Sequence, residues 1–466
     1  MSENKLQSLK DELFYTPRHA METVDEETVK AADEFCEGYK AYMDYAKIER
    51  ESVDFFVEEA KKRGFVEFDS EKKYNAGDKV YYNNRGKSII LCVIGTKSVK
   101  EGVKISAAHI DSPRLDLKPN PLYEDSNLAM LKTHYYGGIK KYQWTAIPLA
   151  MHGVVVKANG EVLKVRIGED DNDPQFVITD LLPHLAADQM KQTLAEGIKG
   201  EGLNILIGSR PFSKDEGSEK VKLNILKILN EKYGIAEDDF LSAELELVPA
   251  FKARDIGFDR GLIGAYGHDD KVCAYPAAQA IFDVENPAYT AITVLTDKEE
   301  TGSDGNTGLN SSYLKYFVYD LAAMEGVEPW RVLSRSECLS ADVNAAFDPN
   351  YPEVSERMNS SFVNNGVVIT KYTGARGKGG TSDASAEYMG KVRRMLNENG
   401  VVWQIGELGK VDMGGGGTVA MYIANLDVDV IDLGIPVLSM HAPYEVVSKL
   451  DVYMGYRAFK TFFEQK

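Results

Sequence analysis

The sequence has few cysteines, and they follow no metal-binding or disulfide pattern. Its 466 residues include four, Cys36, Cys92, Cys273 and Cys338. None of them has a partner at the C-x-x-C spacing of a zinc ribbon or a redox pair, and their wide separation argues against a disulfide framework. We therefore predict four buried free thiols that pack as small apolar side chains.

Long apolar runs are also missing. The first residues, MSENKLQSLKDELFYTPRHA, lack a basic start followed by an apolar stretch. No later segment approaches the roughly 20 apolar residues that a membrane-spanning helix needs. These absences predict a cytoplasmic protein without a membrane partner.

Basic charge is scarce relative to acidic charge. The chain has 54 Lys and Arg against 72 Asp and Glu, which gives a formal net charge of -18. Such a field repels phosphate backbones and anionic membrane surfaces, so nucleic acid is excluded as an expected partner. The 44% of hydrophobic residues is typical of a globular chain that buries a large core.

Short apolar runs between helical stretches predict the fold class. These runs are bounded by glycine, proline or polar residues and suit strands of a sheet that is covered on both faces. They occupy residues 89–94, 105–108, 290–295, 338–341 and 435–440, and helical patterns occupy 272–282 and 448–463. The pattern predicts an α/β domain with a largely parallel sheet and flanking helices.

The middle of the chain has a different pattern. Residues 153–165 read as two alternating strands around an Asn159-Gly160 turn, and residues 241–248 alternate again. We predict a β-rich inserted domain at 118–249 that interrupts one catalytic domain formed by 1–117 and 250–466.

Five short polar segments each begin where a predicted strand ends. Ligands of α/β proteins bind outside the carboxyl ends of the strands, so residues from these segments are expected to meet in one crevice. A single His-x-Asp or Glu-Glu pair is commonly a solvated loop, and the inference rests on the recurrence of such residues in all five. The segments are 108–111, 267–271, 297–303, 340–344 and 439–442.

Histidine and carboxylate ligands are those of a hydrolytic zinc site, and two zinc ions can share one bridging carboxylate. We assign Asp269 as the bridge between the ions. His109 and Asp342 are assigned to one ion, and Glu300 and His441 to the other. The same ligands also suit cobalt or manganese.

Two further acids receive catalytic roles. Glu299 is left without a metal and is the expected general base, which takes a proton from water and returns it to the leaving amine. Its role differs from that of Glu300 only if the chain bends, and Thr301-Gly302-Ser303 permits a bend. Asp111 is expected to accept the second ring N–H of His109.

Two glycine-rich loops remain, at 374–379 and 413–418. Neither has the spacing of a nucleotide-binding loop. Each is either a plain turn or a place where the backbone approaches a substrate closely, which makes Gly416 a candidate substrate-binding residue.

At these segments the chain resembles the aspartyl aminopeptidase and aminopeptidase I family of two-zinc metallopeptidases, in its bacterial branch. The resemblance covers essentially the whole length. It rests on Ala108-His109-Ile110-Asp111-Ser112-Pro113-Arg114, Glu299-Glu300-Thr301-Gly302-Ser303, Ser340-Ala341-Asp342 and Met440-His441.

The resemblance implies a catalytic α/β domain with two zinc ions and a β-rich dimerisation domain. It also implies dimers that assemble into a dodecamer around enclosed active sites. Leu182-Pro183-His184-Leu185 resembles a family segment whose histidine enters the neighbouring subunit's site, so His184 is a candidate substrate-binding residue.

Residues 371–386 do not resemble the matching stretch of eukaryotic aspartyl enzymes. Lys371, Arg376 or Lys378 either binds a substrate carboxylate or belongs to a charged surface loop.

The expected function is removal of single residues from the free N-termini of peptides. The alternatives are a carboxypeptidase or N-acyl amino acid deacylase on a related two-metal fold, which would act on blocked substrates, and a metal-binding scaffold without turnover. An uncoordinated Glu299 argues against the scaffold. The sequence leaves open which N-terminal residue is preferred and which metal is physiological.

Overall fold

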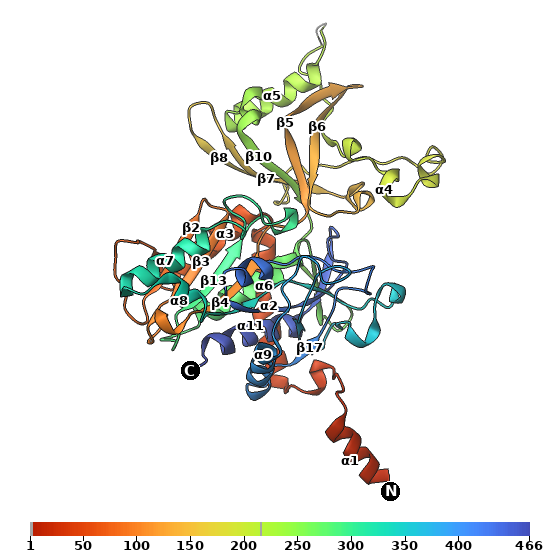
Figure 1. The fold of residues 1–466 in the computed structure, drawn as a ribbon. Helices are drawn as coiled ribbons and strands as arrows, with labels where there is room; N and C mark the ends of the chain where they lie inside the picture. The colour runs from red at the N-terminus through yellow and green to blue at the C-terminus, as the bar shows by residue number, and fades with distance from the viewer. Residues whose placement is uncertain (1–2, 215–216) are drawn as a thin grey trace.

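The computed structural model describes residues 3–214 and 217–466 and contains three β-sheets. A nine-stranded and a five-stranded sheet lie in one part of the molecule. A six-stranded sheet stands apart from them, at the top of Figure 1. Helix α1 (Glu3–Leu13) projects from the opposite end.

The nine-stranded sheet confirms the predicted α/β class. Its central strands β13, β4, β14 and β18 are mutually parallel, and antiparallel pairs occur at β2–β3, β3–β13 and β18–β16. In sheet order the strands are β1 (Val66–Glu67), β2 (Lys79–Asn84), β3 (Ser88–Val93), β13 (Ala291–Thr296), β4 (Lys104–His109), β14 (Glu337–Ser340), β18 (Asp429–Gly434), β16 (Val367–Thr370) and β17 (Trp403–Ile405).

Helices cover both faces of this sheet, and alternate side chains of one strand enter different cores. Ile89 and Leu91 of β3 belong to one apolar cluster, and Ile90 and Cys92 belong to the other. The first cluster includes α2 (Glu26–Tyr45), α3 (Glu49–Lys62), α6 (His268–Phe282), α9 (Ala386–Glu398) and α11 (Lys449–Phe463); the second includes α7 (Tyr313–Glu325), α8 (Pro329–Leu333) and α10 (Ala420–Ala424). Burial on both faces explains why these strands read as continuous apolar runs.

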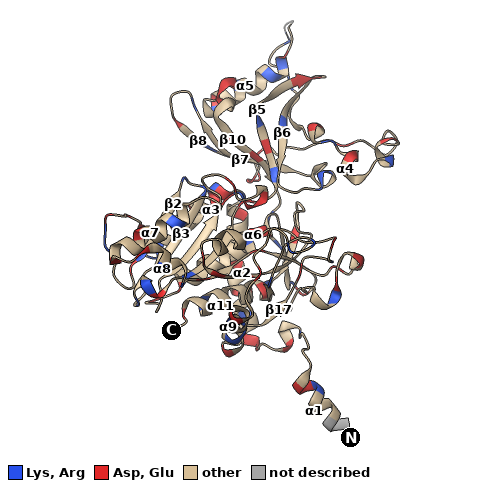
Figure 2. Ribbon diagram, in the orientation of Figure 1, with Lys and Arg blue, Asp and Glu red and all other residues tan. Residues whose placement is uncertain are grey.

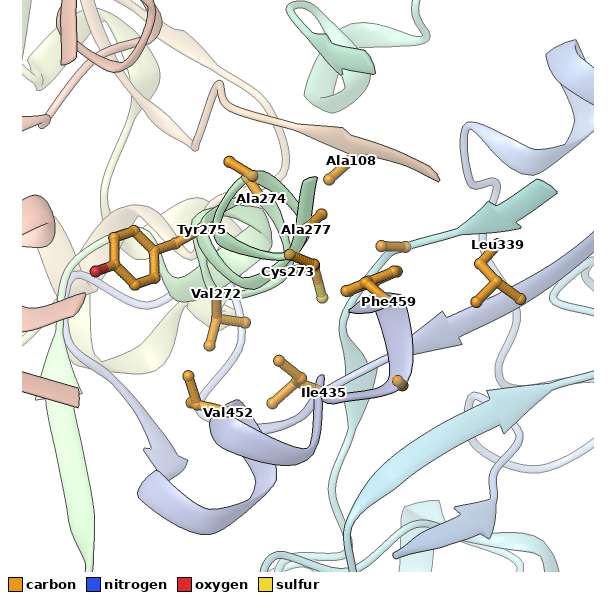
Figure 3. Packing of buried hydrophobic residues seen from close by; sticks show 14 of the residues in the cluster. Ala108, Val272, Cys273, Ala274, Tyr275, Ala277, Leu339, Ile435, Val452 and Phe459 are labelled. Carbon is orange, nitrogen blue, oxygen red and sulfur yellow. The ribbon is translucent and has the colours of Figure 1, made fainter. Parts of the chain in front are cut away.

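Helix α6 is buried along its whole length. Figure 3 shows Ala274 and Ala277 on its side toward Ala108 of β4, and Val272 facing Val452 of α11. Small side chains let the helix lie close to the strand. This packing fixes the start of α6, where Asp269 lies.

The five-stranded sheet lies beside the first residues of α6. Strand β12 leads through Gly267 into the helix, and β19 and β20 flank the turn that contains His441. In sheet order the strands are β11 (Arg254–Ile256), β12 (Leu262–Ala265), β20 (Glu445–Ser448), β19 (Pro436–Leu438) and β15 (Asn344–Ala345).

The six-stranded sheet is antiparallel, and helix α5 (Lys220–Tyr233) packs against it over a separate apolar core. Strand β5 begins at Arg114, so the predicted domain limit after residue 117 falls inside a strand, while β10 ends at the predicted limit, Pro249. In sheet order the strands are β8 (Val162–Ile167), β7 (Leu149–Val156), β10 (Ala243–Pro249), β5 (Arg114–Asp125), β6 (Leu128–Tyr136) and β9 (Ile205–Gly208). A short helix, α4 (Leu194–Gly197), lies in the same part of the chain.

The cysteines and the helices bear on two of the sequence-based expectations. All four cysteines are free and buried, as predicted. Among the described residues, no helix has the length and apolar character to cross a membrane.

Candidate metal centre

The predicted ligands lie at the carboxyl-end edge of the central strands. His109 ends β4, Asp342 lies two residues beyond β14, and Glu299 and Glu300 follow β13. Glu299, Glu300 and Asp342 line a cavity of about 480 Å³. Asp269 of α6 and His441 of the β19–β20 turn also line it, and His109 contacts Asp269.

Asp269 lies between the two histidines. Its Oδ1 is 3.0 Å from Nε2 of His109, and its Oδ2 is 3.2 Å from Nε2 of His441. The two imidazoles therefore meet on the two oxygens of one carboxylate, although 332 positions separate them in sequence (441 minus 109). This is the arrangement that a bridging ligand requires.

The remaining acids surround the same nitrogens. Nε2 of His109 is 3.9 Å from Oδ1 of Asp342 and 3.9 Å from Oε2 of Glu299. Nε2 of His441 is 3.6 Å from Oε2 of Glu300. Ligand atoms of a tetrahedral zinc site with bonds of about 2.0–2.2 Å lie about 3.3–3.6 Å apart. The separations are close to that range.

Asp111 is surrounded by donors. Its Oδ1 accepts the backbone N–H of Glu299 at 3.1 Å and lies 3.2 Å from Nδ1 of His109. Its Oδ2 accepts the N–H of Glu300 at 3.2 Å and the hydroxyl of Tyr136 at 2.8 Å. Because Nδ1 of His109 also lies 3.0 Å from the backbone carbonyl of Asp111, that nitrogen faces Asp111 and Nε2 faces Asp269.

Sequence reasoning missed the acid that holds the other side of the centre. Glu445, in β20, accepts the backbone N–H of His441 at 2.7 Å and that of Asp269 at 3.1 Å. Burial and the nearby Asp269 carboxylate raise the pKa of Glu445 to about 8. Its position four residues after His441 was the only signal in the sequence.

The two adjacent glutamates lie on a tight turn. The bend was predicted at Thr301-Gly302-Ser303, but it begins earlier, where Lys298 has a φ of +68°. A single 3-10 turn, Glu299–Thr301, follows and ends at Gly302 with a φ of +99°. Glu300 is thereby more deeply buried than Glu299, with side-chain exposures of 3% and 18%.

The centre has an excess of buried negative charge. Burial, together with the neighbouring Glu299 and Asp270 carboxylates, raises the pKa of Asp342 well above its ordinary value. Burial and Asp269 do the same to the pKa of Glu300. Within the described part of the chain, Oε1 of Glu300 has no hydrogen-bond partner although it is buried. Divalent cations would compensate these charges, so the donor set fits metal ions.

Asp270 is a second acid beside His109. Its Oδ2 accepts the backbone N–H of His109 at 3.3 Å, and the neighbouring Lys271 donates to the carbonyl of Lys47. His109, Asp270 and Asp342 form one group with ligand atoms close enough to hold an ion, and His109, Asp269 and Glu300 form another. Because the two groups share His109, they belong to one metal-binding region.

The candidate substrate-binding residues have different surroundings. Gly416 lines the cavity. Lys371 forms an ion pair with Asp383 next to Thr370, which lines the cavity. His184 is exposed on a turn of the inserted part.

The sequence is similar to known proteins over most of its length. Residues 42–463 match the family model for aminopeptidase I zinc metalloproteases (M18). A probable M18 family aminopeptidase 1 of Clostridium acetobutylicum is 49% identical over 460 residues, which is 96% of this chain and 99% of the relative. A probable M18 family aminopeptidase 1 of Thermotoga maritima is 45% identical, over 92% of this chain and 96% of the relative.

Solved structures agree in fold. The M18 aminopeptidase from Thermotoga maritima superposes with a TM-score of 0.93 at 43% identity, covering 97% of this chain and 100% of that one. Aminopeptidase I from Clostridium acetobutylicum has a TM-score of 0.92 at 47% identity, with the same coverage. The S. cerevisiae mApe1 dodecamer has a TM-score of 0.74 at 21% identity and covers 93% of this chain and 96% of that one, a likeness of fold alone.

Proposed function

The chain belongs to the aminopeptidase I zinc metalloprotease (M18) family and is a metalloaminopeptidase, and from this premise we propose that it removes N-terminal residues from peptides at a two-zinc centre built around Asp269. The observation that carries the proposal is the contact of both Asp269 oxygens with the two histidines, at 3.0 and 3.2 Å.

In this proposal His109 and Asp342 would hold one ion, and Glu300 and His441 would hold the other. Asp269, whose two oxygens face the two histidines, would serve both. When bound, two zinc ions supply Lewis acidity that polarises a carbonyl and lowers the pKa of water. Cobalt or manganese can substitute at such ligands, and metal analysis of the purified protein will give the number and kind of ions.

Glu299 is the proposed general base. It lines the cavity with its Oε2 3.9 Å from Nε2 of His109, and its side chain is more exposed, at 18%, than those of the assigned ligands Asp342 and Glu300, at 11% and 3%. Burial raises its pKa to about 7, a value suited to a group that both takes and returns a proton near neutral pH. Glu299 accepts a proton from the attacking water and delivers it to the nitrogen of the departing peptide.

Asp111 keeps Glu299 in position. The carboxylate of Asp111 accepts the backbone N–H groups of both Glu299 and Glu300 while it faces the Nδ1 of His109. One side chain thus orients a metal ligand and the turn that carries the base.

Three residues are proposed on the substrate side. Gly416 leaves room in the cavity wall because it has no side chain. Lys371 is a candidate for a substrate carboxylate if its contact with Asp383 opens. His184 is exposed on the inserted part and is proposed to act in the site of a neighbouring subunit.

We further propose that the chain forms dimers that assemble into a dodecamer. Large apolar side chains are exposed around His184, and an interface would remove them from water. They are Leu181, Leu182, Leu185, Met190 and Leu194, each 50–74% exposed. A protein of similar fold is a dodecamer. Light scattering will give the assembly size, and a monomer at micromolar concentration contradicts this proposal.

The free buried thiols support a cytoplasmic location.

The test of the mechanism is Glu299→Gln. The amide keeps the shape of the side chain but accepts no proton, so kcat is expected to fall by about 10²–10⁴-fold. Metal content and the melting temperature are expected to stay unchanged. An activity close to that of the parent would remove Glu299 as the base.

A second assay tests the reaction class. Release of amino acids is compared for a free peptide and its N-acetylated form. Only the free peptide should be cleaved, and equal cleavage of both would contradict an enzyme that requires the free N-terminal amine.

A further inference from the structure

Three residues at the end of β6 extend from the inserted part to both sides of the metal centre. They are Tyr136, which is the last residue of β6, and Gly137 and Gly138, which follow that strand. The hydroxyl of Tyr136 reaches Asp111, and the carbonyl of Gly138 reaches His441. One short segment therefore contacts the surroundings of both histidines.

The contact of Tyr136 is on the His109 side. Its hydroxyl donates to Oδ2 of Asp111 at 2.8 Å, while Oδ1 of the same carboxylate faces Nδ1 of His109 at 3.2 Å. The hydroxyl acts together with the backbone N–H groups of Glu299 and Glu300, which donate to Oδ1 and Oδ2, to keep Oδ1 beside the histidine. Nδ1 of His109 is held in this way, and Nε2 points at Asp269.

The ring of Tyr136 is itself clamped. The guanidinium carbon of Arg114 lies 3.9 Å from the ring centroid. Arg114 is in turn paired with Glu49 of α3 at 3.3 Å and with Glu246 of β10 at 3.1 Å. Residues from both parts of the molecule thus hold the ring, so its hydroxyl has little freedom to move.

The contact of Gly138 is on the His441 side. Its carbonyl oxygen is 2.7 Å from Nδ1 of His441, which makes Nδ1 the protonated nitrogen and leaves Nε2 for the cavity. The space is tight, because a Cβ at Gly138 would lie 3.3 Å from Nδ1 of His441. A Cβ at Gly137, where φ is +73°, would lie 3.1 Å from Oε2 of Glu300.

We propose that Tyr136 is a positioning residue of the metal centre, and that the segment Tyr136–Gly138 orients both imidazoles, His109 through Asp111 and His441 through the Gly138 carbonyl. The inference rests on the proposed ligand assignment. Groups that hold the second nitrogen of a metal-bound histidine typically change metal affinity by about 10–100-fold when they are removed.

Two substitutions should affect different ions. Tyr136→Phe keeps the ring against Arg114 and removes only the hydroxyl, so it should weaken the ion at His109. Gly138→Ala presses on the ring of His441 and should weaken the other ion. Tyr135→Phe is the matched control, because Tyr135 is the preceding residue of β6 and is 42% exposed.

The experiment measures zinc binding to metal-free protein by competition with a chelator, in the backgrounds His441→Ala and His109→Ala. Tyr136→Phe should raise the Kd by about tenfold in the His441→Ala background and by less than twofold in the His109→Ala background. Gly138→Ala should give the reverse pattern. Tyr135→Phe should leave both values unchanged.

Kinetics with saturating zinc provide a second readout. Tyr136→Phe should lower kcat more than it changes KM, because Asp111 also holds the backbone of Glu299. The melting temperature of the metal-free protein should stay within a degree or two of the parent, because the ring remains packed.

Failure of the inference differs from failure of the ligand assignment. If His109→Ala and His441→Ala each remove one zinc but Tyr136→Phe leaves both Kd values and kcat unchanged, Tyr136 has no positioning role. If neither histidine substitution lowers the zinc stoichiometry, the assignment itself is wrong. Equal weakening of both ions by Tyr136→Phe would show a general structural effect and overturn the inference.

Discussion

The position of Asp269 is set by neighbours on both sides of it. Ser112 Oγ donates to its backbone carbonyl at 2.7 Å, and Glu445 accepts its backbone N–H. Gly267, two residues earlier, has a φ of +77°, and a Cβ there would lie 2.6 Å from the amine of Lys271 and 2.8 Å from Ser112 Oγ. The position of the Asp269 carboxylate therefore needs a glycine before it and a hydroxyl beside it.

Gly434 leaves room for the backbone of Asp342, and its substitution tests whether this close approach is needed. A Cβ at Gly434 would lie 1.6 Å from the backbone oxygen of Asp342, so Gly434→Ala must displace that segment. We expect a loss of about 1–3 kcal/mol in the free energy of unfolding, with weaker zinc binding. Denaturant titration and metal analysis measure the two effects.

Gly390→Ala is the control for that substitution. Gly390 lies inside α9, and a Cβ there would meet no described atom within 4 Å. This change should be neutral or slightly stabilising, because alanine favours a helix over glycine. A Gly434→Ala protein as stable as the parent would mean that the backbone of Asp342 moves freely.

At the scale of elements, the strands were the most predictable part. Their residues are buried on both faces, so β3, β4 and β13 stand out as apolar runs, and His109 ends such a run. The convergence of His109 and Asp342 follows, because parallel strands end at one edge of the sheet. Each strand is recognised from residues near one another in sequence, and the convergence then follows from the general geometry of parallel sheets.

The contacts of the inserted segment could not be predicted in this way. Tyr136 and Gly138 approach the centre because β6 pairs with β5 and returns the chain to Arg114, and that pairing depends on the whole inserted sheet. Glu445 is likewise placed by the pairing of β20 with β12. Tertiary pairings of this kind leave little trace in local sequence patterns.

The N-terminus of helix α9 is stabilised by a side-chain cap. Ser385 caps its N-terminus by accepting the backbone N–H of Tyr388 at 3.1 Å, and the buried Tyr388 hydroxyl donates to the carbonyl of Cys338 in β14. Ser385→Ala should cost about 1 kcal/mol of stability, measured by denaturant unfolding. Ser385→Thr retains the capping oxygen and should lose less than Ser385→Ala. Equal losses would exclude the cap as the cause.

At the scale of the whole molecule, charged residues are spread over both parts of the ribbon (Figure 2). Some of their side chains join the two parts. His152 of β7 is buried between two acids, with Nδ1 2.8 Å from Glu51 of α3 and Nε2 3.1 Å from Glu169. Lys252 donates to Glu169 at 2.7 Å, and Arg166 lies 4.0 Å from Glu51. This cluster links the inserted sheet to the helical layer below it.

The cluster should make stability depend on pH. Burial lowers the pKa of His152, but contacts with Glu169 and Glu51 outweigh it, so the pKa is raised above 6.5. A raised pKa adds stability that is fully present below the unfolded value of about 6.5 and is lost as pH rises through the folded value. Contacts with His152, Lys47 and Lys252 outweigh burial and lower the pKa of Glu169 to about 2, so its contribution is present above about 4.5 and is lost as pH falls.

The measurement is the melting temperature of the parent and of His152→Gln between pH 5.5 and 9. The difference should be largest near pH 5.5–6.5 and should shrink toward pH 9. A difference that stays constant over this range would mean that the charge of His152 does not contribute.

The four buried cysteines can also report local unfolding of the elements that contain them. Burial raises the pKa of each thiol and keeps it from alkylating reagents, so a thiol reacts only when its surroundings come apart. Cys36, Cys92, Cys273 and Cys338 lie in α2, β3, α6 and β14, one in each element. The order in which they become labelled in dilute denaturant would therefore rank these four elements by how readily each detaches, without any added probe.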